Sequence, residues 1–593
     1  MKRVPLYLIA ILMLAGCASA PPRPADLARG DLAYLETYMD WYLAQRMRSQ
    51  NVPGISVALV SDEKILWMKG YGYADAEQQI PATTRSVYQI GSISKTLTAV
   101  AVMQQVERGA LDLDVPIQTY LPDFSIRSRW GDVPRPTLRE LLSHHAGLPT
   151  YYLKGFFSHQ PLAQLVTALK DEHLAYRPRE IFNYSNLGPD LAGAALERLS
   201  GLDFALTMQD ALLDPLGMSG SSFALDERVR PLFARGYVKG EPAEAVTIRD
   251  VPAGGLFSNV EDLSRFMRMI LGQGMLNGKR IMERSSIEAM LTPQFADARY
   301  DFGQRFGLGL NLSGIPIHNA GVVAWHNGGT KTFISQMALL PEKKLGVVVL
   351  ANADTAGKLV YEAAEDVLRL ALEAREGITQ PAPAPRAPEI TLAPEKLDHL
   401  VGDYSLMGAF ANIERSGNRL VLNVLGNSLE LVPVGGNNFR AEYRVLGLFA
   451  VPITFPPIEF TEVDGRTIML WRDRGIAISS EKIPRQPVPA AWVARTGNYR
   501  LLNPDKEFLV DMKQARLSVE NDRLLMNIRL AGLEDRDVKV VIMPLTDDTA
   551  YTFGVGRNVG DITQVEHLDG RERVRYLGYY FERETSVAEA VSR

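Results

Sequence analysis

The sequence predicts an α+β domain followed by two small all-β domains, and three observations support this prediction. Strand-like pairs at 54–71 and 332–351 frame a long stretch of mixed helix-like and strand-like patterns, as expected for a sheet closed by both ends of its domain. Two proline-rich breaks follow, at 380–388 and 484–489. After the first break, short strand patterns with Asp-Gly and Gly-Asn turn signals dominate.

The first domain is expected to cover residues 30–376, and its elements can be placed in chain order. The apolar spacing predicts a helix at each end of this domain and two strand pairs inside those helices. The expected elements are a helix at 32–47, strands at 54–60 and 64–71, strands at 332–340 and 345–351, and a helix at 358–376. A large helical insertion should separate the two strand pairs.

The C-terminal third contains what looks like two copies of one small domain. Three short segments recur in the same order with a constant offset broken by one insertion of about ten residues, which is typical of a duplicated unit. The matched pairs are Gly402-Asp403-Tyr404 with Gly497-Asn498-Tyr499, 419–424 with 523–528, and Asp464-Gly465 with Asp569-Gly570. We therefore expect a proline-rich linker at 377–390 and antiparallel β-barrel or sandwich domains at 391–484 and 490–585.

Composition excludes several classes of function. The 593 residues carry 64 basic and 69 acidic side chains, a net charge of −5, and no long basic run, which argues against nucleic acid as a partner. The single cysteine, Cys17, excludes an intrachain disulfide, a thiolate zinc cluster and an iron–sulfur site. No pattern of metal ligands or phosphate-binding glycines stands out, so we expect neither a metal nor a cofactor.

The first residues are typical of an export signal. A basic start and an apolar run at 4–15 precede Leu14-Ala15-Gly16-Cys17, which matches the bacterial lipobox. We expect a signal peptide at 1–16, a lipidated Cys17 and a tether at 17–29, giving a periplasmic protein anchored to a membrane. Ala18 is not aspartate, which resembles lipoproteins sent to the outer membrane. The alternative is a plain signal peptide with an incidental cysteine.

Ser92 and Lys95 form a Ser-x-x-Lys motif at the start of an apolar helical run that ends near Gly109. Residues three apart share a face of a helix, so the two side chains should lie close together. A serine hydroxyl needs a neighbouring base to act as a nucleophile, and a desolvated lysine amine can serve as one. The motif alone is weak, because Ser61–Lys64 and Ser479–Lys482 match it too.

Two further motifs follow in the chain. Tyr184-Ser185-Asn186 precedes a predicted helix, and His326-Asn327-Gly328 leads, through Gly329, into the predicted strand at 332–340. In this order the three motifs resemble those of the penicillin-recognising serine hydrolases: class C β-lactamases, D-Ala-D-Ala carboxypeptidases, D-aminopeptidases and related esterases. That family has Ser-x-x-Lys, then Tyr-x-Asn, then Lys-Thr-Gly or His-x-Gly on a strand.

The resemblance covers roughly residues 30–376, including the segments 52–57, 142–149 and 253–258. It implies a β-lactamase/transpeptidase-like α+β fold, in which an antiparallel sheet is flanked by a helical region. Some relatives carry lipocalin-like β-barrels after this domain, which is what the resemblance implies for the two C-terminal units.

The resemblance also implies roles for the motif residues. Ser92 would be the nucleophile, Lys95 would help to deprotonate it, and Tyr184 would be the general acid/base, with a phenol pKa lowered by the neighbouring lysine. Asn186 would bind the substrate amide, and the amides of Ser92 and Gly329 would form the oxyanion hole.

The third motif departs from the Lys-Thr-Gly pattern. His326 would shape the far wall with Gly328 and help the proton network, or be a structural histidine; its identity favours the peptidase and esterase branches. Lys331 either offers a cation to a substrate carboxylate or is simply exposed. His144 and His145, in a loop that the family uses for packing, are expected to be structural.

Together these features predict an exported, lipid-anchored serine hydrolase that cleaves an amide or ester through an acyl-Ser92 intermediate. A D-amino-acid peptide or peptidoglycan fragment is the expected substrate. The alternatives are an esterase or weak class C-type β-lactamase, or a penicillin-binding sensor or cell-wall binding protein without turnover. The expected partners are a small peptide, ester or β-lactam and a membrane, while the oligomeric state and the role of the C-terminal domains stay open.

Overall fold

The computed structural model describes residues 19–24, 27, 29–382, 385–445, 449–452, 457–473, 476–507, 514–529 and 537–584. The expected signal peptide and Cys17 lie outside these residues. Among the helices that the structure describes, none combines the length and the apolar character needed to span a bilayer.

A six-stranded antiparallel sheet forms the centre of the first domain and confirms the predicted closure by both chain ends. Its strand order is β10-β11-β12-β1-β2-β3, so a strand from the start of the domain pairs directly with one from its end. Val57 in β1 lies opposite Val349 in β12. The strands are β1 (Gly54–Ser61), β2 (Ile65–Asp75), β3 (Ile80–Pro81), β10 (Ala324–Gly329), β11 (Ile334–Leu340) and β12 (Leu345–Ala351).

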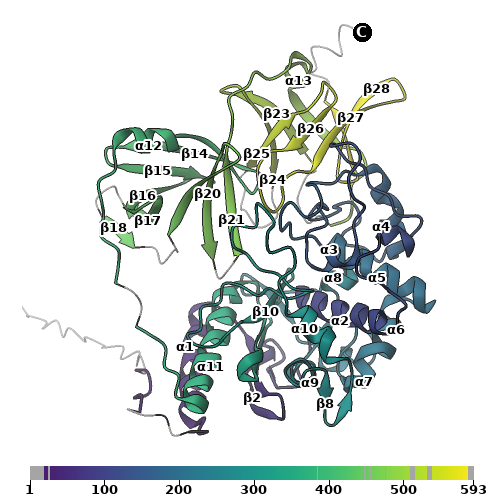
Figure 1. The fold of residues 1–593 in the computed structure, drawn as a ribbon, viewed down its shortest axis with the longest axis vertical. Coiled ribbons are helices and arrows are strands. Elements are labelled where there is room, and N and C mark those ends of the chain that lie inside the picture. Colours follow the sequence, from purple (N-terminus) through teal and green to yellow (C-terminus); the bar gives the residue numbers. More distant parts are fainter. Residues whose placement is uncertain are drawn as a thin grey trace, which may run out of the picture.

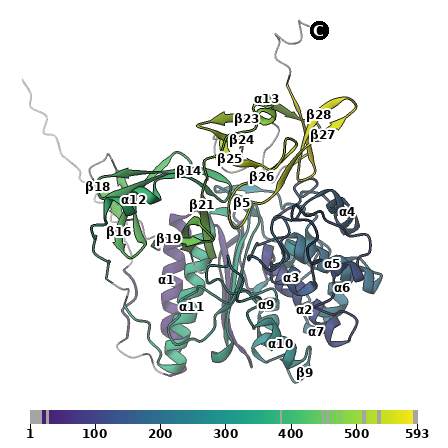
Figure 2. The same cartoon turned by 45° about the horizontal axis from the view of Figure 1, so that its top comes forward.

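Helices cover both faces of this sheet, in agreement with the predicted α+β class. Helices α1 (Ala33–Ser49) and α11 (Gly357–Glu376) lie side by side on one face (Figures 1 and 2). Leu43 of α1 and Leu368 of α11 belong to one apolar core, which also contains side chains of β1 and β12. Strands β1 and β12 are buried along their whole length. Their side chains therefore point alternately into this core and into a second apolar core on the opposite face of the sheet.

The opposite face is covered by the helical insertion between β3 and β10 (Figure 1). Helix α9 (Val260–Leu271) contacts β1, β11 and β12, and α2 (Ser94–Glu107) is buried along most of its length. The other α-helices of the insertion are α3 (Leu138–Leu142), α4 (Leu162–Ala168), α5 (Leu187–Ser200), α6 (Phe204–Met208), α7 (Asp214–Leu216), α8 (Val251–Gly254) and α10 (Arg284–Met290).

The C-terminal region forms two antiparallel barrels. In the first, β13 pairs with β21 and closes a ring from which β18 projects as a hairpin on β17. In the second, β22 pairs with β29 and closes an eight-stranded ring. Their strands are β13 (Gly402–Leu406), β14 (Ala409–Ser416), β15 (Arg419–Val424), β16 (Asn427–Gly435), β17 (Asn438–Val445), β18 (Phe449–Pro452), β19 (Ile458–Val463), β20 (Arg466–Asp473), β21 (Ile476–Lys482), β22 (Gly497–Leu501), β23 (Gln514–Glu520), β24 (Arg523–Arg529), β25 (Asp537–Pro544), β26 (Thr549–Thr552), β27 (Ile562–Leu568), β28 (Arg571–Tyr576) and β29 (Tyr579–Arg583).

The recurring sequence segments occupy equivalent places in the two barrels. The first match opens β13 and β22, the second forms β15 and β24, and the Asp-Gly pairs lie in the β19–β20 and β27–β28 turns. Short helices, α12 (Pro394–Leu400) and α13 (Ala490–Ala494), precede the barrels. In each barrel the first-strand tyrosine donates a hydrogen bond to the carbonyl four residues earlier, Tyr404 to Leu400 and Tyr499 to Arg495.

Both barrels lie on the same side of the first domain, and their strands meet its helical insertion (Figures 1 and 2). Ile468 of the first barrel and Val559 of the second share one apolar cluster with Tyr176 of the insertion. A buried ion pair also joins Arg575 of the second barrel to Glu172, with 2.8 Å between Nη1 and Oε1. The three units therefore bury a common interface.

Candidate active site

Ser92 lies on the one-turn helix η1 (Gly91–Ile93), directly before α2, and two glycines set its position. Gly91 has a positive φ of 56° and its backbone lies against Gly328 and Gly329 of β10. A Cβ on Gly328 would lie only 1.9 Å from the carbonyl oxygen of Ile90. The glycines therefore let the sheet edge approach η1 and place the third motif beside Ser92.

Lys95 is 1% exposed and is fixed by two contacts. Its Nζ lies 3.0 Å from Ser92 Oγ and donates a hydrogen bond of 2.7 Å to the carbonyl of Ala253. Burial disfavours the charged ammonium and lowers the pKa of Lys95 to about 8. About a tenth of the amine is therefore neutral at pH 7, with a lone pair available to the serine hydroxyl.

Tyr184 lies over the same two residues, in the loop before α5. The Nζ of Lys95 is 4.9 Å from the centre of its ring, and the guanidinium of Arg557 is 4.6 Å from it. Desolvation raises the pKa of Tyr184 to about 12, although Arg557 and a hydrogen bond with Ser92 act in the opposite direction. The expectation of a lowered phenol pKa is therefore wrong: the lysine faces the ring, and burial outweighs the nearby charges.

The two histidines of the 142–149 loop differ in their surroundings. His145 is buried, with Nε2 3.1 Å from Asp301 and Nδ1 3.1 Å from Ser143. These contacts fit the expected structural role. His144 instead packs its ring 4.5 Å from the Tyr184 ring, and its Nδ1 accepts a hydrogen bond from the backbone of Ser185. Burial lowers its pKa, so a neutral imidazole supports the phenol.

His326 lies on β10 and forms the wall of the site that faces Tyr184. Its Nδ1 donates a hydrogen bond to the carbonyl of Asn327, so Nε2 carries the lone pair. Nε2 is buried and has no hydrogen-bond partner among the described residues. Burial lowers the pKa of His326 to about 3, so this nitrogen remains a neutral acceptor at physiological pH.

Asn186 is turned away from the cavity toward a buried ion pair. Its Nδ2 donates to Asp250, with 3.3 Å to Oδ2, and Asp250 is bound by Arg249. Arg249 also donates to the carbonyls of Tyr152 and Lys154, which fixes the loop that carries Tyr151. Asn186 therefore lies just behind the cavity wall, and its contact with a substrate amide stays a prediction.

A cavity of about 300 Å³ opens onto Ser92. Tyr184, His326 and Gly329 line it, as does Trp325, whereas Lys95, Asn186 and Gly328 lie behind its surface. Lys331 is exposed and is not part of the lining.

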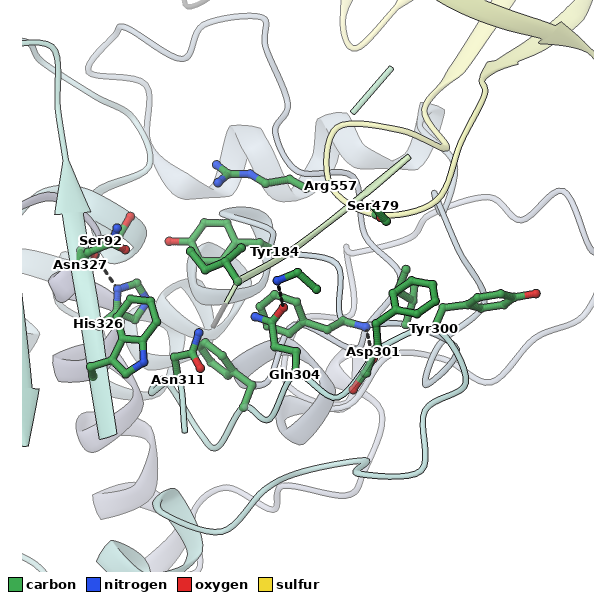
Figure 3. Close-up of a pocket in the computed structure, with 18 of the residues that line it drawn as sticks. Ser92, Tyr184, Tyr300, Asp301, Gln304, Asn311, His326, Asn327, Ser479 and Arg557 are labelled. Carbon is green, nitrogen blue, oxygen red and sulfur yellow. Dashed lines mark hydrogen bonds between the residues drawn. The ribbon is translucent and has the colours of Figure 1, made fainter. Parts of the chain in front are cut away.

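Both barrels contribute to this cavity, which the sequence did not predict. Ser479 comes from β21 of the first barrel and Arg557 from the β26–β27 connection of the second (Figure 3). Arg557 donates a hydrogen bond of 2.7 Å from Nη2 to the hydroxyl of Tyr151. The Ser-x-x-Lys match at Ser479–Lys482 did not distinguish Ser479, and no local motif marks Arg557, because each residue reaches the site only through the docking of its barrel.

Comparisons with known proteins agree with this geometry. The chain is 27% identical over 376 residues to a protein named beta-lactamase from Yersinia enterocolitica, covering 58% of this chain and 94% of that protein. It is 24% identical over 327 residues to protein flp from Staphylococcus aureus (strain MRSA252), covering 54% of this chain and 63% of flp.

A solved structure has a similar fold. The crystal structure of SurE superposes with a TM-score of 0.54 at 24% sequence identity, covering 74% of this chain and 97% of SurE. The family model described as Beta-lactamase matches residues 39–372, which is more than half of the chain and spans all three motifs. The chain therefore belongs to the Beta-lactamase family.

Proposed function

We propose that the protein is an exported, lipid-anchored serine hydrolase that cleaves an amide or ester of a D-amino-acid peptide or peptidoglycan fragment through an acyl-Ser92 intermediate. Membership of the Beta-lactamase family supports the serine hydrolase class. The observation that carries the mechanism is the 3.0 Å contact between Lys95 Nζ and Ser92 Oγ, because it joins a nucleophile to a desolvated base.

In the first half-reaction, the neutral Lys95 amine takes the Ser92 proton while Oγ attacks the carbonyl carbon. The hydrogen bond to Ala253 holds the amine in place during this transfer. The tetrahedral oxyanion is stabilised by the backbone amides of Ser92 and Gly329, two residues that both line the cavity.

Collapse of this intermediate needs a proton donor for the leaving group. Tyr184, with a pKa of about 12, is a neutral phenol near pH 7 and supplies that proton, after which Lys95 returns its proton to the phenolate. Water then attacks the acyl-Ser92 carbonyl, and the same groups run in reverse to release the acid and regenerate the serine.

Export and anchoring rest on the sequence of the first residues. The lipobox ending in Cys17 supports a lipid anchor, and Ala18 at the following position supports an outer-membrane destination. Replacing Cys17 by Ser should abolish lipid labelling and release the protein from the membrane fraction. Unchanged membrane fractionation of Cys17→Ser would contradict the anchor without affecting the catalytic proposal.

The catalytic proposal is tested with protein lacking residues 1–17. A fluorescent penicillin, a chromogenic ester and acylated D-alanine peptides are offered to the wild type and to Ser92→Ala. We expect turnover of at least one substrate by the wild type and a loss of at least about 10⁴-fold in the variant. Equal rates in both proteins would refute the role of Ser92, and stable penicillin labelling without release would indicate a sensor.

A further inference from the structure

The second barrel contributes to the cavity through the connection between β26 and β27, residues 553–561, which we call the roof loop. Several contacts anchor this loop to the first domain. The backbone N–H of Gly556 and the carbonyl of the same residue both bond the Tyr176 hydroxyl, each at 2.9 Å. The backbone N–H of Asn558 donates to Thr150 Oγ1 at 3.1 Å.

The roof loop approaches the first domain too closely for side chains at some positions. Gly560 has a φ of +88°, and a Cβ there would lie 2.5 Å from the carbonyl oxygen of Ala175. Val555 and Val559 add apolar contacts to the cluster shared with Tyr176. These contacts therefore fix the backbone of the roof loop over the site, and with it the Cα position of Arg557.

Arg557 has no anionic partner among the residues that the structure describes. Its guanidinium contacts the Tyr151 hydroxyl and the face of the Tyr184 ring, and no carboxylate in the described part of the chain forms an ion pair with it. Its Nε is buried and has no hydrogen-bond partner in the part of the chain that the structure describes. Arg557 is half-buried and its guanidinium lines the cavity, so donors that the described residues do not use face the space that a substrate would occupy. A cation placed in this way favours an anionic group in the cavity.

The other charged groups near the cavity neither neutralise Arg557 nor compete with it for an anion. Asp301, the acidic residue in the described lining, accepts from His145 Nε2 and from the backbone of Phe182. His326 is neutral, and Lys331 is exposed outside the lining. The sequence left open whether Lys331 binds a substrate carboxylate. Arg557 is the better candidate, because it lines the cavity and Lys331 does not.

The direction of Arg557 indicates which part of a substrate carries the charge. Its guanidinium and the Tyr184 hydroxyl lie next to each other, on the side of Ser92 (Figure 3). In the proposed mechanism Tyr184 protonates the leaving group. An anion bound by Arg557 would then belong to the group that departs, not to the acyl group that stays on the serine.

We propose that Arg557 of the second barrel binds the free carboxylate of a leaving amino acid, so that the protein removes a C-terminal residue from an acylated amino acid or peptide. This proposal rests on the proposed function. The amide C–N bond breaks, Ser92 keeps the acyl group, and the departing amine takes the Tyr184 proton. The amino acid leaves with its carboxylate, and water later releases the acyl group.

The test compares two substrates with the same acyl group, one ending in D-alanine and the other in D-alaninamide, using the full-length protein. The wild type should favour the free acid. Arg557→Gln should lower the ratio of kcat/KM for the acid to that for the amide by about 10- to 100-fold, mainly through KM for the acid, because hydrogen bonds to a charge contribute about 1.5–3 kcal/mol. Arg557→Lys should restore part of the preference.

A matched control is Arg129→Gln. Arg129 stacks 4.1 Å over Tyr551 of the same barrel but does not line the cavity, so its loss should leave the acid-to-amide ratio unchanged. An equal loss on both substrates in Arg557→Gln, or no loss, would overturn the proposal. So would a failure to cleave either substrate while Ser92-dependent ester hydrolysis persists; loss of Ser92 dependence would instead overturn the proposed function.

Discussion

The pH dependence of kcat/KM should report the buried Lys95 amine. Its pKa of about 8 is set by desolvation, and only the neutral form can accept the Ser92 proton. The neutral fraction is about 1% at pH 6 and about 50% at pH 8, so kcat/KM should rise about 50-fold over that interval and level off above about pH 9.

The histidines sharpen this prediction. Burial keeps the pKa of His326 near 3 and that of His144 below its usual value, so neither should produce a step between pH 6 and 7. Tyr184, with a pKa of about 12, should add no descending limb below pH 10. The profile should therefore show a single ascending limb.

The assay is initial-rate hydrolysis of a chromogenic ester from pH 5.5 to 10, with Ser92→Ala run at each pH to subtract background. Lys95→Arg provides the matched variant, since a guanidinium does not deprotonate in this range. The Lys95→Arg variant should lose activity, and its pH profile of kcat/KM should lack the ascending limb. A flat profile, a midpoint near 6.5, or a midpoint above 10 in the wild type would refute Lys95 as the neutral base.

Three other predictions concern packing and stability. Gly328→Ala should abolish activity and lower Tm, because its Cβ would overlap the carbonyl of Ile90, whereas Gly329→Ala, with no atom nearer than 3.7 Å, should keep the wild-type Tm. Burial raises the pKa of Asp561 to about 7, so the fold favours the neutral acid and loses stability as the pH rises from about 4 through 7. Asp561→Asn should flatten that decline in a Tm series, and parallel curves would contradict it. Arg249→Leu leaves a buried carboxylate unpaired and should cost about 3–5 kcal/mol in denaturant unfolding, with a change below 1 kcal/mol refuting the ion pair's importance.

The sequence predicted which residues of the short motifs lie close together, while their catalytic roles stay a prediction. Ser92 and Lys95 are three residues apart, so helix geometry alone brings them together. The apolar pattern predicted the strand at 332–340 but not β10, which carries His326; a strand for this motif was implied only by the family resemblance, and β10 pairs with β11 in the structure. The sheet, its two covering helices and the two barrels were likewise predictable, because each depends on local apolar spacing and turn residues.

What the sequence did not predict depends on contacts between distant segments. Arg557 reaches Tyr184 from a β-turn region of another domain, and no spacing rule connects the two residues. The pKa of Tyr184 was predicted in the wrong direction because the burial of the phenol is a property of the assembled cavity. Asn186 matched its motif, yet its amide is bound by Asp250, whose position only the fold reveals.

The roof loop also bears on which part of a long substrate could reach Ser92. The loop is fixed to Tyr176 and Thr150 and brings Arg557 to the lining of the cavity. Under the carboxylate binding proposed for Arg557, a substrate would have to present its charged terminus to this side of the cavity. The proposed activity would then shorten chains from their ends, one unit per turnover, and leave the interior of a cross-linked network uncut.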